Sequence, residues 1–148
     1  MISINYKVRK LEKKDITPEY FQLLQQLSII SLQDYCDEKN EQFFNTLNSN
    51  HQIYIIEDLA NHKIIGSGTI WMEPKLIRNY GKVAHLEDIV IDKKYRGMSL
   101  GKKLLEHLLE IGKNEGCYKC VLSCEPGLLT FYQNLGFIKY GKHLRLDF

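Results

Sequence analysis

The chain has 148 residues and a formal net charge of +2, with 44% hydrophobic and 26% charged residues. This length is typical of one globular domain that buries its own core, so we expect one domain over residues 1–148. The net charge is too small to favour nucleic acid as a partner. No apolar run reaches the roughly 18 residues of a membrane span, and the first 15 residues lack a secretory apolar segment. We therefore expect a cytoplasmic protein.

The chain contains four cysteines, Cys36, Cys117, Cys120 and Cys124. Disulfides are rare in the cytosol, so free thiols are expected. Cys117 and Cys120 have the spacing of a metal-binding pair, but no second pair of ligands accompanies them. Buried structural thiols are favoured over metal or redox chemistry, and no metal is predicted.

The first half of the chain alternates between strand and helix patterns. Alternation predicts a strand over residues 2–9. Asp15 or Thr17 can cap a helix that has Pro18 in its first turn and carries Phe21, Leu24, Leu27 and Leu32. A second helix is predicted over residues 37–47. Three strands are then expected over residues 52–57, 63–72 and 82–91.

The second half contains the clearest helix, over residues 99–116, with an apolar stripe of Leu100, Leu104, Leu108 and Ile111. A strand over 118–124, a short helix over 126–135 and a last strand over 137–146 follow. This order of elements predicts an α/β fold with a mixed sheet and helices on both faces.

The turn before the long helix has the features of an anion site. A helix start exposes unpaired N–H groups whose partial positive charge suits phosphate oxygens. Gly97 and Gly101 allow close backbone approach, and Arg96 and Lys102 add charge. A nucleotide-binding Walker loop is excluded, because only three residues separate the glycines and Lys103 stands where serine or threonine is needed. A purely structural glycine turn remains an alternative.

The same turn resembles the pyrophosphate loop of the GNAT superfamily of N-acetyltransferases, with Ser99 in place of an inner glycine. The resemblance implies the GNAT fold, a central, mostly antiparallel sheet whose fourth and fifth strands splay apart. It also implies acetyl-CoA as co-substrate. The expected contacts are the backbone of Ile89, Val90 and Ile91 and the loop residues Arg96, Gly97, Met98, Ser99, Leu100, Gly101 and Lys102.

Further strings make the resemblance more specific. HLEDIVI at residues 85–91, GCYK at 116–119 and FYQNLGF at 131–137 are similar to the glucosamine-6-phosphate N-acetyltransferase family. This implies acetyl transfer from acetyl-CoA to the amine of glucosamine 6-phosphate, a step toward UDP-N-acetylglucosamine. It also implies a homodimer in which the partner chain helps to close the sugar pocket.

Catalytic roles follow from the same resemblance. Tyr132 matches a tyrosine that reaches the CoA sulfur, and a phenol can protonate a thiolate. The segment Glu87–Ile89 is implied to contact the sugar, although neighbouring strand residues such as Glu87 and Asp88 should point to opposite faces. Ser123 stands where the family commonly has an acid, and a serine cannot carry negative charge. Glu125 is a possible substitute.

The remaining expected sugar contacts are spread along the chain. For each of them, an ordinary surface position is the alternative. They are Ser28, Lys75, Arg78, Tyr118, Lys119 and Arg145.

Two other functions stay open at this point. The enzyme could acetylate another amine, such as a protein lysine, a polyamine or a different amino sugar, and the replacement at Ser123 favours this interpretation. Alternatively, the chain could bind an acyl-CoA without catalysis, because a fold alone does not determine an activity.

Overall fold

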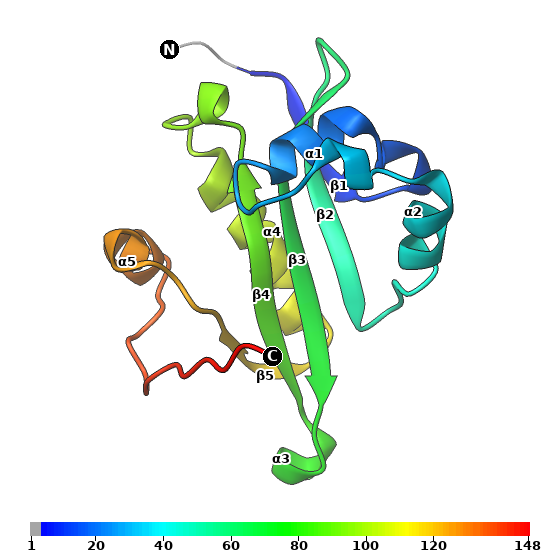
Figure 1. The fold of residues 1–148 in the computed structure, drawn as a ribbon. Coiled ribbons are helices and arrows are strands. Elements are labelled where there is room, and N and C mark those ends of the chain that lie inside the picture. Colours follow the sequence, from blue (N-terminus) through cyan, green and yellow to red (C-terminus); the bar gives the residue numbers. More distant parts are fainter. Residues whose placement is uncertain (1–3) are drawn as a thin grey trace.

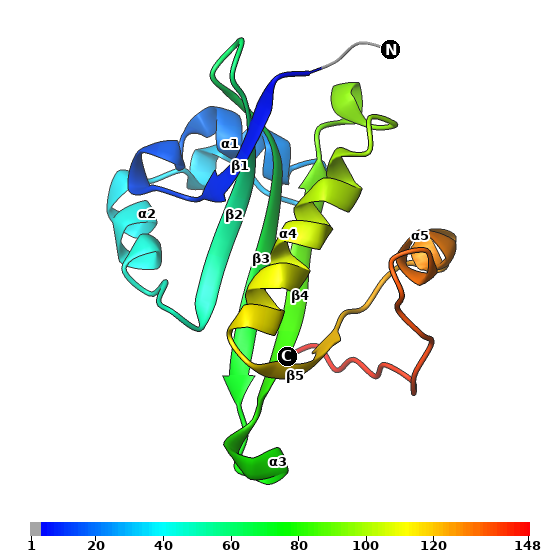
Figure 2. The same ribbon diagram turned by 180° about the vertical axis from the view of Figure 1, so that it is seen from behind.

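The computed structural model of the protein describes residues 4–148. It contains one sheet of five strands with helices on both sides (Figures 1 and 2). The strands are β1 (Tyr6–Lys10), β2 (His51–Asp58), β3 (Lys63–Pro74), β4 (Lys82–Ile91) and β5 (Cys117–Val121). The α-helices are α1 (Pro18–Leu24), α2 (Asp37–Phe44), α3 (Ile77–Tyr80), α4 (Leu100–Asn114) and α5 (Leu129–Gln133). Short 3-10 helices cover Lys13–Asp15, Leu32–Asp34, Lys93–Tyr95 and Pro126–Leu128.

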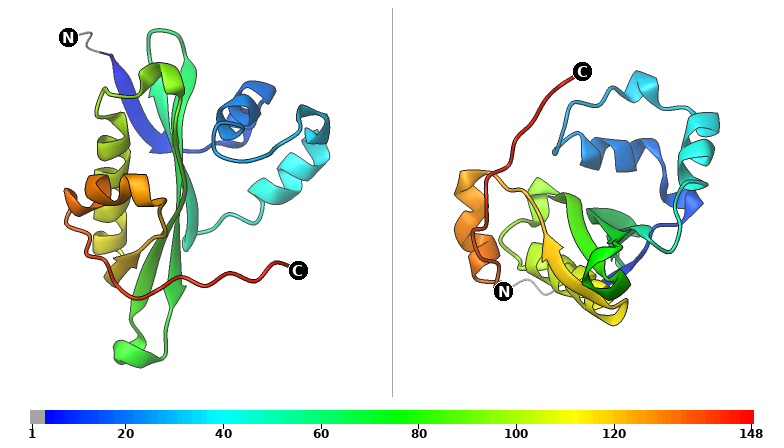
Figure 3. Two further views of the ribbon diagram at one scale, coloured as in Figure 1. Left: turned by 60° about the vertical axis from the view of Figure 1, so that its left-hand side comes forward. Right: turned by 90° about the horizontal axis from the view of Figure 1, so that it is seen from below.

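The sheet order is β1-β2-β3-β4-β5, with antiparallel pairing except between β4 and β5, which run parallel. Helix α4 covers one face, and α1 and α2 lie on the other (Figure 3). The core on the α4 side contains Leu104, Leu105 and Leu108, all fully buried. A second core on the other side includes Leu23 and Ile55. The predicted mixed sheet with helices on both faces is confirmed.

The predicted pattern of α4 is also confirmed. Leu100, Leu104, Leu105 and Leu108 are at most 3% exposed, while the lysines and glutamates of the helix face solvent. The predicted first helix, in contrast, is too long. It begins as expected, with Thr17 accepting a hydrogen bond from the Tyr20 N–H, but α1 ends at Leu24. Gln25 is its C-cap, so Leu27 and Leu32 lie outside the helix and are about two-fifths exposed.

The strand predicted over 137–146 is wrong, because residues 134–148 form no strand. The apolar residues alternate, but a strand needs a neighbouring strand and a core for one of its faces. Here the segment extends away from the sheet toward the C-terminus (Figure 3). The preceding strand is also shorter than predicted, since β5 ends at Val121. At the other end of the chain, residues 2 and 3 of the predicted first strand lie outside the described residues.

Arg9 ties β1 to its surroundings through an ion cluster. Its guanidinium donates two hydrogen bonds to the Asp15 carboxylate, at 2.7 and 2.8 Å, and a third to Glu57 at 2.7 Å. The Asp15 side chain is 7% exposed and those of Arg9 and Glu57 are 17% exposed. The cluster therefore joins β1, β2 and the turn before α1 in a largely dehydrated position.

Candidate active site

The sheet opens between β4 and β5. These strands pair from Lys82 with Cys117 to His85 with Val121, and no pair follows. Beyond His85, β4 continues to Ile91 while the other chain segment turns away toward α5 (Figure 1). Among the described residues 4–148, none forms a strand beside the backbone of residues 86–91 on this side, and an extended molecule can pair with it in the manner of an added strand.

A bulge interrupts β4 inside this opening. Thr69 of β3 pairs with Glu87 and Ser67 pairs with Val90, so Gly68 stands opposite two residues. One of them, Asp88, has a positive φ of 53°. A side chain at position 68 would bring its Cβ within 2.7 Å of Ile89 Cδ1, which explains the glycine.

The bulge also breaks the regular alternation of side chains. Leu86 and Ile89 are three residues apart, yet both pack against the core on the α4 side. The expectation that Glu87 and Asp88 point to opposite faces assumed a regular strand. Because β4 is bulged at these residues, the alternation rule does not apply to them.

The expected anion loop lies at the start of α4. The first helical hydrogen bond runs from the Lys103 N–H to the Ser99 carbonyl at 3.1 Å, so the N–H groups of Leu100, Gly101 and Lys102 have no helical acceptor. Gly97 has a φ of 81°, and a Cβ atom at this position would have no other atom within 4 Å. The Arg96 Nε donates to the Ile91 carbonyl at 3.0 Å, which anchors the loop to the end of β4.

Ser99 adopts a left-handed conformation, with φ 59° and ψ 10°, and its side chain makes no capping hydrogen bond. This conformation costs a non-glycine residue about 1 kcal/mol. We therefore expect Ser99→Gly to raise the free energy of unfolding by about 0.5 kcal/mol, since the relief of strain exceeds the entropy that glycine gains in the unfolded chain. Urea denaturation measures the change. Ser31 is the matched control, because it caps a helix at φ −90° with its side chain, and Ser31→Gly should not stabilise. Equal destabilisation by both changes would contradict the interpretation.

Tyr132 lies on α5 at the far side of the opening and is 7% exposed. Its ring packs edge-on against Phe131 and Phe137, with ring centres 5.2 and 5.8 Å away. Burial, and to a smaller extent nearby Cys124, raises the pKa of Tyr132 above its ordinary value. The phenol therefore stays protonated at neutral pH and can donate a hydrogen bond.

The comparisons with known proteins agree with this geometry. The model of the acetyltransferase (GNAT) family matches residues 15–137. The chain belongs to the GNAT acetyltransferase family. It is 37% identical to glucosamine 6-phosphate N-acetyltransferase of Arabidopsis thaliana over 88% of this chain and 89% of that protein. It is 34% identical to glucosamine 6-phosphate N-acetyltransferase 1 of Dictyostelium discoideum, covering 93% and 88% of the two chains.

Among solved structures, the chain superposes on glucosamine-6-phosphate N-acetyltransferase from Arabidopsis thaliana with a TM-score of 0.91. The sequences are 34% identical, and the match covers 97% of this chain and 99% of the other. The GNAT fold predicted from the sequence is thus confirmed, together with the acetyltransferase class of the enzyme.

Three of the expected sugar contacts meet at the other end of β4. The Arg78 guanidinium lies 5.8 Å from the ring centre of Tyr118, and the Lys119 ammonium lies 5.7 Å from it. Lys75 is nearby in sequence, but its ammonium is 2.6 Å from Glu73. Lys75, and then His85, lower the pKa of the Glu73 carboxyl, so this acid holds its negative charge beside the cations.

Two other expected contacts are not part of this group. Ser28 is exposed in the loop after α1, and its neighbour Gln26 accepts a hydrogen bond from the N–H of Lys93, just past the other end of β4. Arg145 is exposed on the C-terminal segment, and its Nε donates to Asp147 at 2.6 Å. Within residues 4–148, no hydrogen bond or ion pair joins Ser28 or Arg145 to Arg78 or Lys119.

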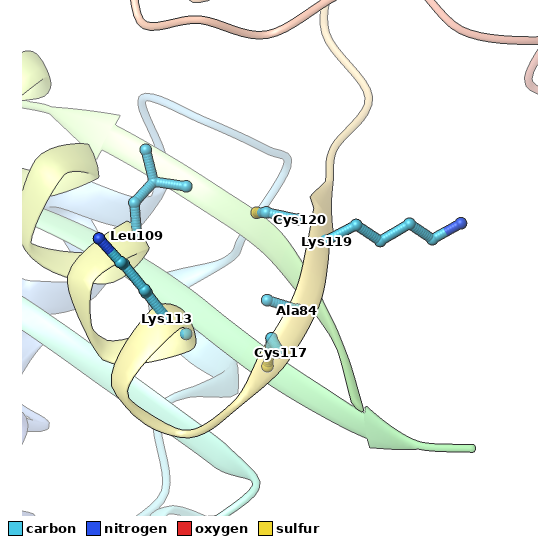
Figure 4. Close-up of a pocket in the computed structure, with 7 residues that line it drawn as sticks. Ala84, Leu109, Lys113, Cys117, Lys119 and Cys120 are labelled. Carbon is cyan, nitrogen blue, oxygen red and sulfur yellow. The ribbon is translucent and has the colours of Figure 1, made fainter. Parts of the chain in front are cut away.

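The cysteines of β5 face away from the opening. Cys117 and Cys120 line a cavity of about 150 Å³ with Leu109 and Lys113 of α4, whereas Lys119 points to the other side (Figure 4). Burial raises the pKa of the Cys120 thiol to about 12, which keeps it protonated and unreactive. The four cysteines are free thiols. Within residues 4–148, no three histidine, cysteine or acidic side chains gather as metal ligands.

Two contacts near the site could not be found from the sequence. Ser123 Oγ lies 3.1 Å from His143 Nδ1, on the C-terminal segment. His85 Nε2 lies 3.0 Å from Glu73 and its ring packs against Trp71. Both join segments that are distant in the sequence, and no local pattern signals such contacts.

Proposed function

We propose that the protein transfers the acetyl group of acetyl-CoA to the amine of glucosamine 6-phosphate. The observation that carries the proposal is the opening beyond the His85–Val121 pair, which leads along β4 to the free N–H groups of α4. It suits an extended molecule with a pyrophosphate at one end. The names of relatives at 33–37% identity over most of the chain support the same reaction.

Acetyl-CoA is bound along β4 and at the start of α4. The N–H groups at the start of α4 and the side chains of Arg96 and Lys102 hold the pyrophosphate. The open space at Gly97 fits this role, since no side chain blocks the loop. The backbone of residues 89–91 pairs with the pantetheine arm. Tyr132 donates a proton toward the sulfur as the thioester breaks.

The sugar is assigned to the start of the opening beside Glu87, and its phosphate to the cations at the end of β4 that pairs with β5. Glu87 and Asp88 at the bulge hold the hydroxyl groups and the amine. The cations Arg78 and Lys119, with Lys75, bind the phosphate, because arginine offers a two-pronged donor and lysine a point charge. Ser28 and Arg145 complete the site only if their segments or a second protomer approach it.

Release of free thiol from acetyl-CoA, measured with a panel of amines, tests this function. We expect strong preference for glucosamine 6-phosphate over glucosamine, because only the former uses the cations. Equal turnover of the two sugars would reject the phosphate assignment. Turnover of peptide lysines or polyamines alone would establish a different amine as acceptor, and saturable CoA binding without any turnover would establish a non-catalytic protein.

We propose, in addition, that the protein works as a cytoplasmic homodimer. The C-terminal segment exposes Ile138, Tyr140, Leu144 and Leu146 by 78–90%, and such a row of apolar side chains normally marks a protein–protein contact. Within residues 4–148, no helix is both long and apolar enough to cross a membrane. Sedimentation at micromolar concentration should give twice the mass of the 17.4 kDa chain. A monomer at that concentration would reject the dimer.

A further inference from the structure

The contact between Ser123 and His143 lies at the point where β4 and β5 separate. Val121 is the last residue of β5 that pairs with β4, and its partner is His85. Ser123 and Glu87 each follow two residues later on the diverging segments. The serine hydroxyl thus stands at the start of the opening, level with the β4 residues that we assign to the sugar.

Side-chain alternation places Ser123 on the sugar side of the sheet. Cys120, Leu122 and Cys124 pack against the core on the α4 side. Lys119 points to the opposite side (Figure 4), and Ser123 follows it at an even spacing. The C-terminal segment starts beside α5 and crosses to end on the side of the sheet opposite α4 (Figure 3). Both side chains are exposed, so a substrate can reach the pair.

The proposed reaction needs a proton acceptor here. A primary amine in water at neutral pH is mainly an ammonium ion, and it must lose a proton before it can attack a thioester. A serine hydroxyl can accept a hydrogen bond but does not hold the proton. An imidazole can, since neutral histidine has one free ring nitrogen. In this chain, the ring nitrogen Nδ1 of His143 is the atom that meets the serine.

We propose that His143 accepts the proton of the substrate ammonium through the hydroxyl of Ser123. The inference rests on the proposed function. The ammonium gives a proton to Ser123 Oγ while the serine hydroxyl proton moves to His143 Nδ1, which leaves a neutral amine and an imidazolium. The amine nitrogen then forms the C–N bond, the C–S bond breaks, Tyr132 gives its proton to the sulfur, and the second amine proton restores the tyrosine hydroxyl. The imidazolium returns its proton to water.

His143→Asn tests the relay most directly, because the asparagine amide can keep a hydrogen bond to Ser123 but cannot take up a proton. We expect kcat to fall by about 10²-fold in His143→Asn, His143→Ala and Ser123→Ala, with the KM values within about threefold of wild type. The double variant Ser123→Ala/His143→Ala should be no slower than either single variant, since one pathway is lost in each. Free imidazole should restore part of the turnover in His143→Ala.

His62→Asn is the control, since His62 is 81% exposed on the β2–β3 turn, and it should leave kcat unchanged. Wild-type kcat in His143→Asn would show that the histidine only orients the serine, and additive losses in the double variant would exclude a shared pathway. Loss of turnover in Glu125→Gln alone would assign the proton to Glu125 instead. Failure of the wild-type enzyme to acetylate any amine would reject the proposed function itself, which is a separate and distinguishable result.

Discussion

Tyr132→Phe should lower kcat by on the order of 10²-fold, the usual effect of removing one general acid. The change removes only the hydroxyl oxygen. The ring keeps its edge-on contacts with Phe131 and Phe137, so the position of α5 should be unaffected. Within residues 4–148, no hydrogen bond ties the Tyr132 hydroxyl to another protein group, so the change breaks no internal hydrogen bond.

The expected loss concerns the chemical step rather than binding. Burial raises the pKa of Tyr132, so the proton is present at neutral pH and is given up only when a strong acceptor forms beside it. The departing thiolate is such an acceptor, whereas the intact thioester is a poor one. In the proposed reaction the hydroxyl stabilises the transition state more than the bound substrate, so kcat should fall while acetyl-CoA affinity changes little.

Steady-state kinetics and calorimetric titration with acetyl-CoA separate these effects. Tyr6→Phe is the matched control, because Tyr6 is a partly buried tyrosine on β1 that packs against the same core. It should retain wild-type kcat. Unchanged kcat in Tyr132→Phe would exclude the tyrosine as the acid, and a parallel loss in both variants would indicate a general effect of core tyrosines.

The sheet and α4 could be predicted because their patterns are local. Strand β4 matches the predicted range of 82–91, and the stripe from Leu100 to Leu108 identifies the buried face of α4. The bulge at Asp88 could not be predicted, because it depends on how β4 pairs with β3. Thr69 of β3 pairs with Glu87, whereas Ser67 pairs with Val90. Alternation over 137–146 predicted a strand. A strand also requires a neighbouring strand to pair with, and the sequence pattern does not identify one.

In the candidate site too, the local motifs could be predicted from the sequence and the long-range contacts could not. The loop from Arg96 to Lys102 and the pair Phe131–Tyr132 are short motifs whose positions follow from the adjoining helices. The contact of Ser123 with His143 spans twenty residues, and that of Arg78 with Tyr118 spans forty. Such contacts depend on how the chain turns after β5 and at α3. The missing acid at Ser123 was visible in the sequence, but the histidine beside it was not.

Arg9→Met should lower the free energy of unfolding by about 2–3 kcal/mol, because removing one partner of a buried ion pair leaves the other charge without compensation. Asp15, at 7% side-chain exposure, would lose both hydrogen bonds from the guanidinium. Lys13→Met is the matched control. The Lys13–Glu41 pair is equally short, at 2.6 Å, but both side chains are 55% exposed, and its loss should cost less than about 1 kcal/mol.

The pH dependence identifies the cause. Burial alone raises the pKa of Asp15, but hydrogen bonds from Arg9 and the Glu12 N–H outweigh it, so the pKa lies below its ordinary value. Arg9 also lowers the pKa of Glu57. This stabilisation is complete above the ordinary carboxyl pKa of about 4 and is lost as the pH falls through the lowered values. The difference between wild type and Arg9→Met, measured by urea denaturation, should therefore be largest near pH 7 and shrink toward pH 3. A constant difference would mean that the aliphatic part of Arg9, rather than its charge, stabilises the fold.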